Sequence, residues 1–83
     1  AYTLSDGEYE VIEAEIIETS ELINKEIKNS NLPDELRIGA VLRDKKIIIP
    51  RSNFVFKKDD RVVFIVKKDS ISFVENIFRL SSV

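Results

Sequence analysis

The chain contains no cysteine and no histidine. Without cysteine, disulfides, thiolate metal sites and cysteine nucleophiles are excluded. Without histidine, the sequence lacks the commonest general base and metal ligand, and triads of the Ser-His-Asp type are impossible. The only glycines are Gly7 and Gly39, so no glycine-rich loop is available to hold a phosphate. These absences argue against a catalytic centre, and we expect no enzyme activity within these residues.

Methionine is also absent, from which we read the chain as a fragment of a larger protein. Its 83 residues fit one domain, and 43% hydrophobic with 34% charged residues is the profile of a folded globular chain. No apolar run approaches the ~18–20 residues of a membrane span, and no signal peptide is visible. Any membrane protein in its biology is therefore expected to be a partner.

The net charge of −2 conceals two halves of opposite sign. Residues 1–36 carry ten acids and two lysines, which gives −8, whereas residues 37–83 carry eleven bases and five acids, which gives +6. The halves can attract each other within one fold or between two copies, or simply mix over one surface. Nucleic-acid binding is not expected, because no basic stripe carries interleaved aromatic residues.

Period-two patterns predict four strands. Residues 10–18 alternate, with Ile12, Ala14 and Ile16 on one face. Residues 36–43 and 46–50 read as a hairpin with a tight turn at Asp44 and Lys45, which lacks the usual glycine. In the first strand of the hairpin, one face is expected to hold Leu36, Ile38, Ala40 and Leu42, and the other Arg37, Gly39, Val41 and Arg43. The segment "RVVFIV" is apolar on both faces, which predicts a central strand or one covered by a partner.

Two segments read as helices, residues 19–29 and residues 67–80. Thr19 or Ser20 can cap the first, and Asp69 or Ser70 the second. The predicted order is β-α-β-β-β-α. It describes an α+β domain with a mostly antiparallel sheet and two helices. Residues 1–8 are expected to form a linker or N-terminal arm, residues 9–80 the domain and residues 81–83 a tail.

Two charged clusters are candidate sites. Glu13 and Glu15 share a strand face and can contribute oxygens to a hard cation such as calcium, although a solvated acidic face is the simpler interpretation and we assign no metal site. Arg51 follows a rigid proline at a strand end, so its guanidinium can hold a phosphate or carboxylate, or else pair with the acidic half. Arg37 and its neighbour Ile38 complete the candidate ligand-binding residues.

The sequence also has more apolar surface than one core requires. Three consecutive isoleucines place apolar side chains on both faces of one strand, and the central strand does the same. Either a helix covers each face or a second copy does. We favour the second copy, with a dimer interface formed by Ile47, Ile48, Ile49, Val63 and Ile65.

The stretch "LPDELRIGAVLRDKKIIIPRSNFVFKKDDRVVFIV" resembles the TrkA C-terminal (RCK-C) domain family. The resemblance covers roughly residues 9–80, and its most specific parts are the Ile38-Gly39-Ala40 and Ile49-Pro50-Arg51 segments. Where the family often has glycine before an aspartate, this chain has Asp59 before Asp60, so the turn is expected to be less left-handed or to be borne by Asp59. Family members that bind cyclic di-AMP usually carry an Asp-Leu/Ile-Arg segment here, whereas this chain reads "LPDELRI", which argues against that ligand.

The resemblance implies a C-terminal regulatory, dimerising domain in a cytosolic regulator of a Trk-type potassium uptake system, peripheral on the inner face of the plasma membrane. The implied partners are a second copy, a membrane-embedded potassium transporter subunit and an upstream domain of the same chain. A nicotinamide or adenine nucleotide is expected only in that upstream domain, and no cofactor in these residues. The domain would sense a small effector. The alternatives are a ligand-free structural dimerisation module of a cation transporter or antiporter, and an adaptor that binds peptides by strand addition.

Overall fold

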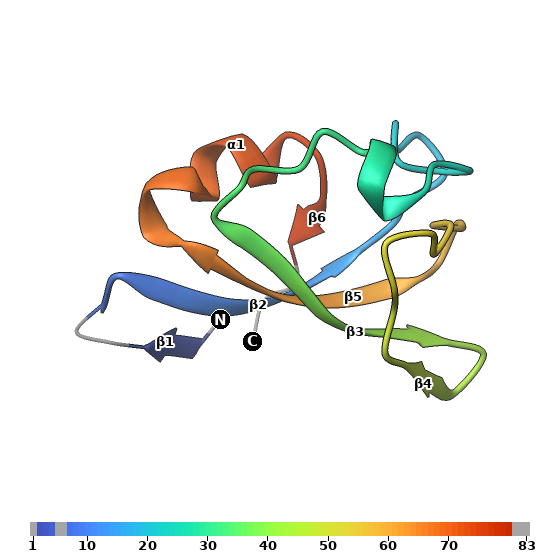
Figure 1. The fold of residues 1–83 in the computed structure, drawn as a ribbon, viewed down its shortest axis with the longest axis horizontal. Coiled ribbons are helices and arrows are strands. Elements are labelled where there is room, and N and C mark those ends of the chain that lie inside the picture. The colour runs from blue at the N-terminus through green and yellow to red at the C-terminus, as the bar shows by residue number, and fades with distance from the viewer. Residues whose placement is uncertain (1, 5–6, 81–83) are drawn as a thin grey trace.

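One antiparallel sheet organises the molecule (Figure 1). The computed structural model describes residues 2–4 and 7–80. Its strands are β1 (Tyr2–Leu4), β2 (Tyr9–Glu15), β3 (Leu36–Arg43), β4 (Lys46–Ile48), β5 (Arg61–Lys67) and β6 (Arg79–Leu80). Their order across the sheet is β1-β2-β5-β3-β4, and β6 pairs with the end of β2. The predicted α+β class with a mostly antiparallel sheet is confirmed.

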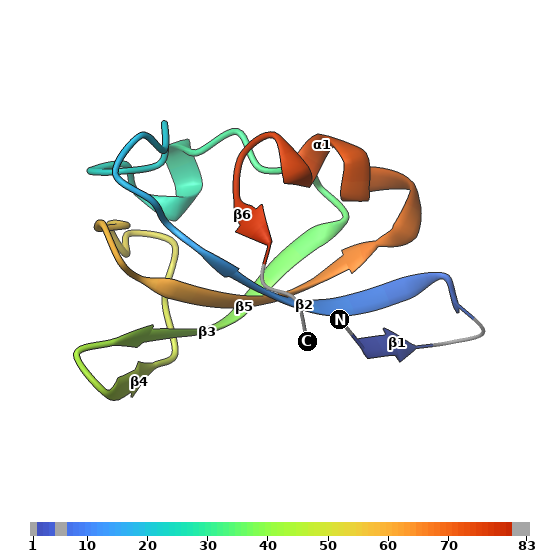
Figure 2. The ribbon, with the colours of Figure 1, turned by 180° about the vertical axis from the view of Figure 1, so that it is seen from behind.

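The sheet has one covered and one open face. Helix α1 (Ile71–Glu75) and the loops between β2 and β3 lie on one side of it, and no described segment lies over the other (Figures 1 and 2). The core fills the covered side. Its buried residues are Ile12, Ala14, Ile16, Leu22, Leu36, Val41, Phe56, Val62, Phe64, Val66, Val74 and Phe78. None of the helices in the described part of the chain has the length and apolar composition needed to span a bilayer.

β5 is the central strand, as its apolar pattern predicts. It pairs with β2 over seven residue pairs and with β3 along its other edge. Val62, Phe64 and Val66 point into the core and are at most 1% exposed. The alternation predicted for β2 is confirmed as well, since Ile12 and Ala14 are buried on the same face. Burial of one face of each strand fixes their register, because a slip by one residue would expose the whole apolar set.

A β-bulge interrupts β3 and changes the predicted faces. The register with β5 shifts between Ile38 and Ala40, so Gly39 is the extra residue. Regular alternation would place Val41 and Arg43 on the face opposite to Leu36. Instead, Val41 is fully buried in the same core as Leu36. The prediction of the two faces was therefore wrong beyond Gly39, because an extra residue exchanges the faces of all later positions.

The β3–β4 hairpin closes through the predicted two-residue turn. Asp44 and Lys45 have φ values of 51° and 66°, which is the left-handed conformation at both central positions of a type I′ turn. β4 ends at Ile48, two residues before the expected end at Pro50. The hairpin projects from one side of the sheet (Figure 1).

The helix expected over residues 19–29 does not form. Asn24 has a φ of 68°, which breaks a right-handed helix, and only a 3₁₀ turn at Ile27–Asn29 remains. The backbone pairs instead with a distant loop: Asn24 N–H donates to the Phe56 carbonyl at 2.9 Å, and Phe56 N–H donates to the Lys25 carbonyl at 3.1 Å. Tertiary hydrogen bonds have overridden a weak local helix preference.

The C-terminal helix is present but shorter than predicted. α1 ends at Glu75, and Arg79 and Leu80 form β6. In the predicted N-terminal arm, residues 2–4 form β1, which pairs with β2. The predicted tail, residues 81–83, lies outside the described residues.

The left-handed turn gives a first testable prediction. Replacing Lys45 by glycine removes the steric cost of a side chain at φ 66° and should raise the free energy of unfolding by about 0.5–1 kcal/mol. Lys46→Gly is the matched control, because Lys46 lies in the extended strand, where glycine destabilises. Urea unfolding measures both variants. Equal destabilisation by the two changes would contradict the assigned turn.

Candidate functional site

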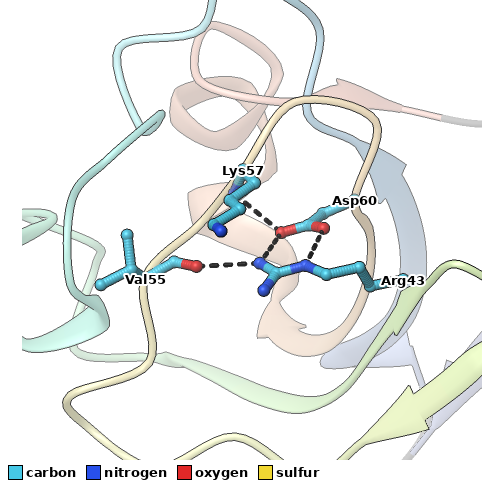
Figure 3. A network of polar contacts seen from close by, with 4 residues as sticks. All are labelled: Arg43, Val55, Lys57 and Asp60. Carbon is cyan, nitrogen blue, oxygen red and sulfur yellow. Dashed lines mark hydrogen bonds and ion pairs between the residues drawn. The ribbon is translucent and has the colours of Figure 1, made fainter.

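A buried ion pair ties the β3–β4 hairpin to the start of β5 (Figure 3). Arg43 Nε donates to Asp60 Oδ1 at 2.7 Å, and Arg43 Nη2 donates to Asp60 Oδ2, also at 2.7 Å. The same Nη2 donates to the Val55 carbonyl at 2.9 Å. Such a two-pronged contact between guanidinium and carboxylate fixes orientation as well as distance. The Asp60 side chain is 1% exposed and that of Arg43 is 25% exposed.

The turn before β5 is built around Asp60. Lys57 N–H donates to Asp60 Oδ2 at 2.8 Å, which closes the loop on the carboxylate. Asp59 bears the left-handed conformation, with a φ of 71°, so the second of the two predicted alternatives is correct. Its N–H donates to the Ile16 carbonyl at 2.8 Å, and Ile16 N–H donates to the Asp60 carbonyl at 2.9 Å. The end of β2 is thereby attached to the same turn.

An aromatic row continues from the ion pair into the core. The Arg43 guanidinium lies 4.7 Å from the centre of the Phe54 ring, a cation–π arrangement. Phe54 contacts Phe56 edge to face with ring centres 5.9 Å apart, and Phe78 stacks on Phe64 at 5.0 Å. Hydrogen bonds to Asp60 raise the pKa of the Arg43 guanidinium above its usual range. Arg43 is therefore a permanently charged structural residue held by Asp60, the Val55 carbonyl and the Phe54 ring.

A surface hollow brings together two of the candidate ligand-binding residues. Arg37 and Ile38 line it, with the 3₁₀ turn and the loop before β3 as its other walls, and its volume is about 450 Å³. Arg37 Nη1 donates to the carbonyls of Asp34 at 2.7 Å and Leu36 at 2.9 Å, which holds the exposed guanidinium against the rim. The remaining lining residues are Ile27, Lys28, Asn31, Leu32, Pro33, Asp34 and Leu36. The hollow thus combines an apolar wall with two cations.

Arg51 lies elsewhere. It is exposed in the loop after β4 and is not among the residues that line this hollow. The structure therefore groups Arg37 with Ile38 and separates both from Arg51. No sequence pattern indicates that Lys28 is a neighbour of Arg37, because the two become adjacent only when the loop folds back across the end of the sheet.

Three of the five predicted interface residues, Val63, Ile65 and Ile47, share the open face of the sheet. Residues directly opposite each other on paired strands point to the same side. Val63 lies opposite Glu13 and Ala40, Ile65 lies opposite Val11 and Arg37, and Leu42 lies opposite Arg61 and Ile47. The open face therefore carries three rows that run across the strands.

The apolar part of the open face is broad. Ile47 and Ile49 are 72% and 74% exposed, and both point away from the core, whereas Ile48 packs against the core from the opposite face. Beside Gly39, which has no side chain, a depression of about 230 Å³ lies between Val63 and Ile65. Arg37 lines both this depression and the larger hollow. Ile38 lines both as well, so the hollow and the open face meet at two adjacent residues.

The acidic pair on β2 is not arranged for a metal ion. Glu13 pairs with Arg61, with Oε2 and Nη2 3.1 Å apart, and hydrogen bonding to Arg61 lowers the pKa of Glu13 below its usual value. Over residues 2–4 and 7–80, no group of three potential ligands gathers around one point. The two charged halves are partly interleaved. Two ion pairs join the halves, Lys58 with Glu18 and Arg61 with Glu13. The ion pair of Arg43 with Asp60 lies within the basic half.

Comparison with known protein families matches residues 11–79 to the TrkA-C domain. The chain belongs to the TrkA-C domain family. Among curated proteins, it is 40% identical over 80 residues to the Trk system potassium uptake protein TrkA of Azorhizobium caulinodans, covering 96% of this chain and 18% of that protein. It is 31% identical over 77 residues to a TrkA homolog of Archaeoglobus fulgidus, again covering 18% of the relative. The chain therefore spans about a fifth of the length of these relatives.

The solved structures confirm the fold. A chain described as "Structure of RCK domain with cda" superposes with a TM-score of 0.69, covering 83% of this chain and 97% of that chain. Its sequence identity is 14%, so this likeness concerns the fold. The family resemblance inferred from the sequence is confirmed by the family match and by the curated relatives.

The buried ion pair yields a second prediction. Asp60→Asn leaves the Arg43 guanidinium facing a neutral group and should lower the free energy of unfolding by about 3 kcal/mol. For a domain of this size, such a loss corresponds to a fall of more than about 10 °C in Tm. Differential scanning calorimetry measures it.

Glu18→Gln is the matched control. It breaks the ion pair to Lys58, whose atoms lie 3.8 Å apart between side chains that are 77% and 56% exposed. Exposed ion pairs contribute little, so its Tm should stay close to that of the wild type. A small effect of Asp60→Asn, comparable with that of the control, would show that the Arg43 contact does not support the fold.

Proposed function

We propose that this chain is the C-terminal regulatory domain of a peripheral subunit of a Trk-type potassium uptake system. The observation that carries this proposal is the family membership over residues 11–79, together with relatives named as Trk system potassium uptake proteins. The domain would act on the cytoplasmic face of the plasma membrane, bound to a membrane-embedded transporter subunit. A nicotinamide or adenine nucleotide would bind an upstream domain of the same chain.

The open face of the sheet supports self-association. Val63, Ile65 and Ile47 form an apolar surface, and Glu13 and Arg37 lie at its margins. A surface of this kind on a small domain is typical of an interface rather than of a solvated face. A second copy related by two-fold symmetry would cover it with the same residues. Of the two remaining predicted residues, Ile48 packs against the core from the covered side, and Ile49 is exposed just beyond β4.

Effector sensing would occur at the hollow beside β3. Its volume is in the range of small-molecule sites, and it combines the apolar side chain of Ile38 with the guanidinium of Arg37. Because Arg37 also lines the depression on the open face, an anionic ligand in the hollow would change the charge at the edge of the dimer interface. Ligand occupancy and subunit arrangement would then be coupled through the two residues that line both, with Arg37 carrying the charge. A ligand-free dimerisation module is the alternative.

Sedimentation of the purified chain over a concentration series tests the interface. We expect the wild type to dimerise and Val63→Lys to weaken the dimer at least tenfold, because two-fold symmetry buries the new charge twice. Ser72→Lys is the control, since Ser72 is an exposed residue of α1 on the covered side of the sheet. A wild type that remains monomeric at all concentrations would refute the dimer.

Calorimetric titration with inorganic phosphate and pyrophosphate as anionic probes tests the hollow. Arg37→Gln should weaken binding at least tenfold, because hydrogen bonds to a charged group contribute about 1.5–3 kcal/mol. Arg51→Gln removes the same charge outside the hollow and should leave the affinity unchanged. Equal losses for the two variants would contradict the assignment. No heat with either anion would favour the ligand-free module, and the dimer test would still stand by itself.

A further inference from the structure

The outer edge of β4 presents backbone groups with no neighbouring strand. In a two-residue hairpin, the residues that flank the turn, here Arg43 and Lys46, exchange hydrogen bonds. The next pair, Leu42 with Ile47, then lies between hydrogen-bonded pairs, so the N–H and C=O of Ile47 point away from β3. Ile49 follows directly after β4. Within the described ranges, no loop or turn provides a backbone hydrogen bond to Ile47 or Ile49.

The side chains at this edge are apolar, exposed and of types that favour pairing with another strand. Ile47 and Ile49 are the two most exposed large apolar residues described, at 72% and 74%. Both are β-branched, and β-branched residues favour extended backbone and pack well across neighbouring strands. Natural proteins usually protect an apolar edge of this kind or use it for binding. The edge of β4 is therefore suited to accept an additional strand.

The charges beside the edge indicate the kind of strand that fits. Lys45 and Lys46 precede the isoleucines and Arg51 follows them, and all three side chains are exposed. In the part of the chain that the structure describes, none of these cations takes part in an ion pair. The only acid in this stretch, Asp44, lies beside the positive charge of Arg43. An incoming strand therefore meets positive charge at both of its ends.

A second copy of β4 fits poorly. Antiparallel pairing of two copies about Ile48 would bring the Lys45–Lys46 end of each strand close to Arg51 of the other copy. Like charges directly opposite each other destabilise a strand pair. A segment that is apolar in the middle and acidic at both ends would instead be attracted at each end. Charge complementarity thus distinguishes between the two occupants.

We propose that the β4 edge binds an extended segment of another protein by strand addition, with an apolar, β-branched centre and acidic residues at both ends. The segment would hydrogen-bond to Ile47 and Ile49 and place its acids near Lys45, Lys46 and Arg51. This contact uses backbone groups at the side of the sheet, whereas the dimer interface uses side chains on its open face. Both can therefore exist in one assembly, and neither depends on the other.

Hydrogen exchange measured by NMR on the whole chain tests the proposal directly. The probe is the synthetic peptide Ac-EEVTVTVEE-NH2, and its control is Ac-KKVTVTVKK-NH2. The acidic peptide should slow exchange of the Ile47 and Ile49 amides at least tenfold. The Ile48 amide is an internal control, because it already faces β3 and should change little. The basic peptide should leave all three amides unchanged.

Charge reversal provides the matched variant. In the triple variant Lys45→Glu, Lys46→Glu and Arg51→Glu, the acidic peptide should bind at least tenfold more weakly and the basic peptide should now bind. These residues are exposed, so the fold should persist, which circular dichroism checks. Equal binding of both peptides to the wild type would overturn the proposal.

Two further outcomes separate this proposal from the dimer. Protection of Ile47 that appears without peptide and increases with protein concentration would show that a second copy occupies the edge, and would overturn the proposal. If Val63→Lys abolishes self-association but leaves peptide binding intact, the edge site is supported independently of the open face.

Discussion

The contact between Arg43 and Asp60 is the constraint on which the rest of this small domain depends. The carboxylate is buried at 1% exposure and receives hydrogen bonds from the Arg43 guanidinium and from the Lys57 backbone. A buried charge is tolerated only when it is paired and hydrogen-bonded in this way. Because Arg43 is the last residue of β3 and Asp60 directly precedes β5, the pair sets the relative position of the hairpin and the central strand. The arginine also covers Phe54, from which the aromatic row leads into the core.

The two faces of the sheet differ in what they contact. The covered face holds the core and fixes the register, whereas the open face and the β4 edge remain available for partners. Arg37 lies where the hollow beside β3 meets the open face. An arrangement in which one side chain borders both a ligand-sized hollow and an apolar interface is physically suited to regulation, because a charge bound on one side alters the electrostatics of the other. On the proposed function, the domain would transmit the presence of a bound ligand to the subunit interface.

Sequence patterns predicted β2, the hairpin, the central position of β5 and the helical segment before β6, because burial of one face imposes a period of two or of 3.6 residues. They did not predict the conformation of residues 19–29. There, helix-compatible residues are used to form hydrogen bonds with the loop around Phe56, some thirty residues later in the chain. They also placed Val41 and Arg43 on the wrong face, since a single extra residue at Gly39 leaves the composition of the strand unchanged but exchanges its faces.

By itself, the sequence determined the fold class, the family and the absence of histidine and cysteine chemistry, because these follow from residue types, their periodicity and motifs that are local in the chain. It also determined that the isoleucine-rich strand has more apolar surface than the core can bury. Only the tertiary structure decided that Arg43 is a structural residue, that Arg37 and not Arg51 lines the hollow, and that Ile47 faces outward while Ile48 faces the core. Each of these outcomes depends on a bulge, a turn or a loop contact between residues distant in sequence, and such contacts form only when the whole sheet is assembled.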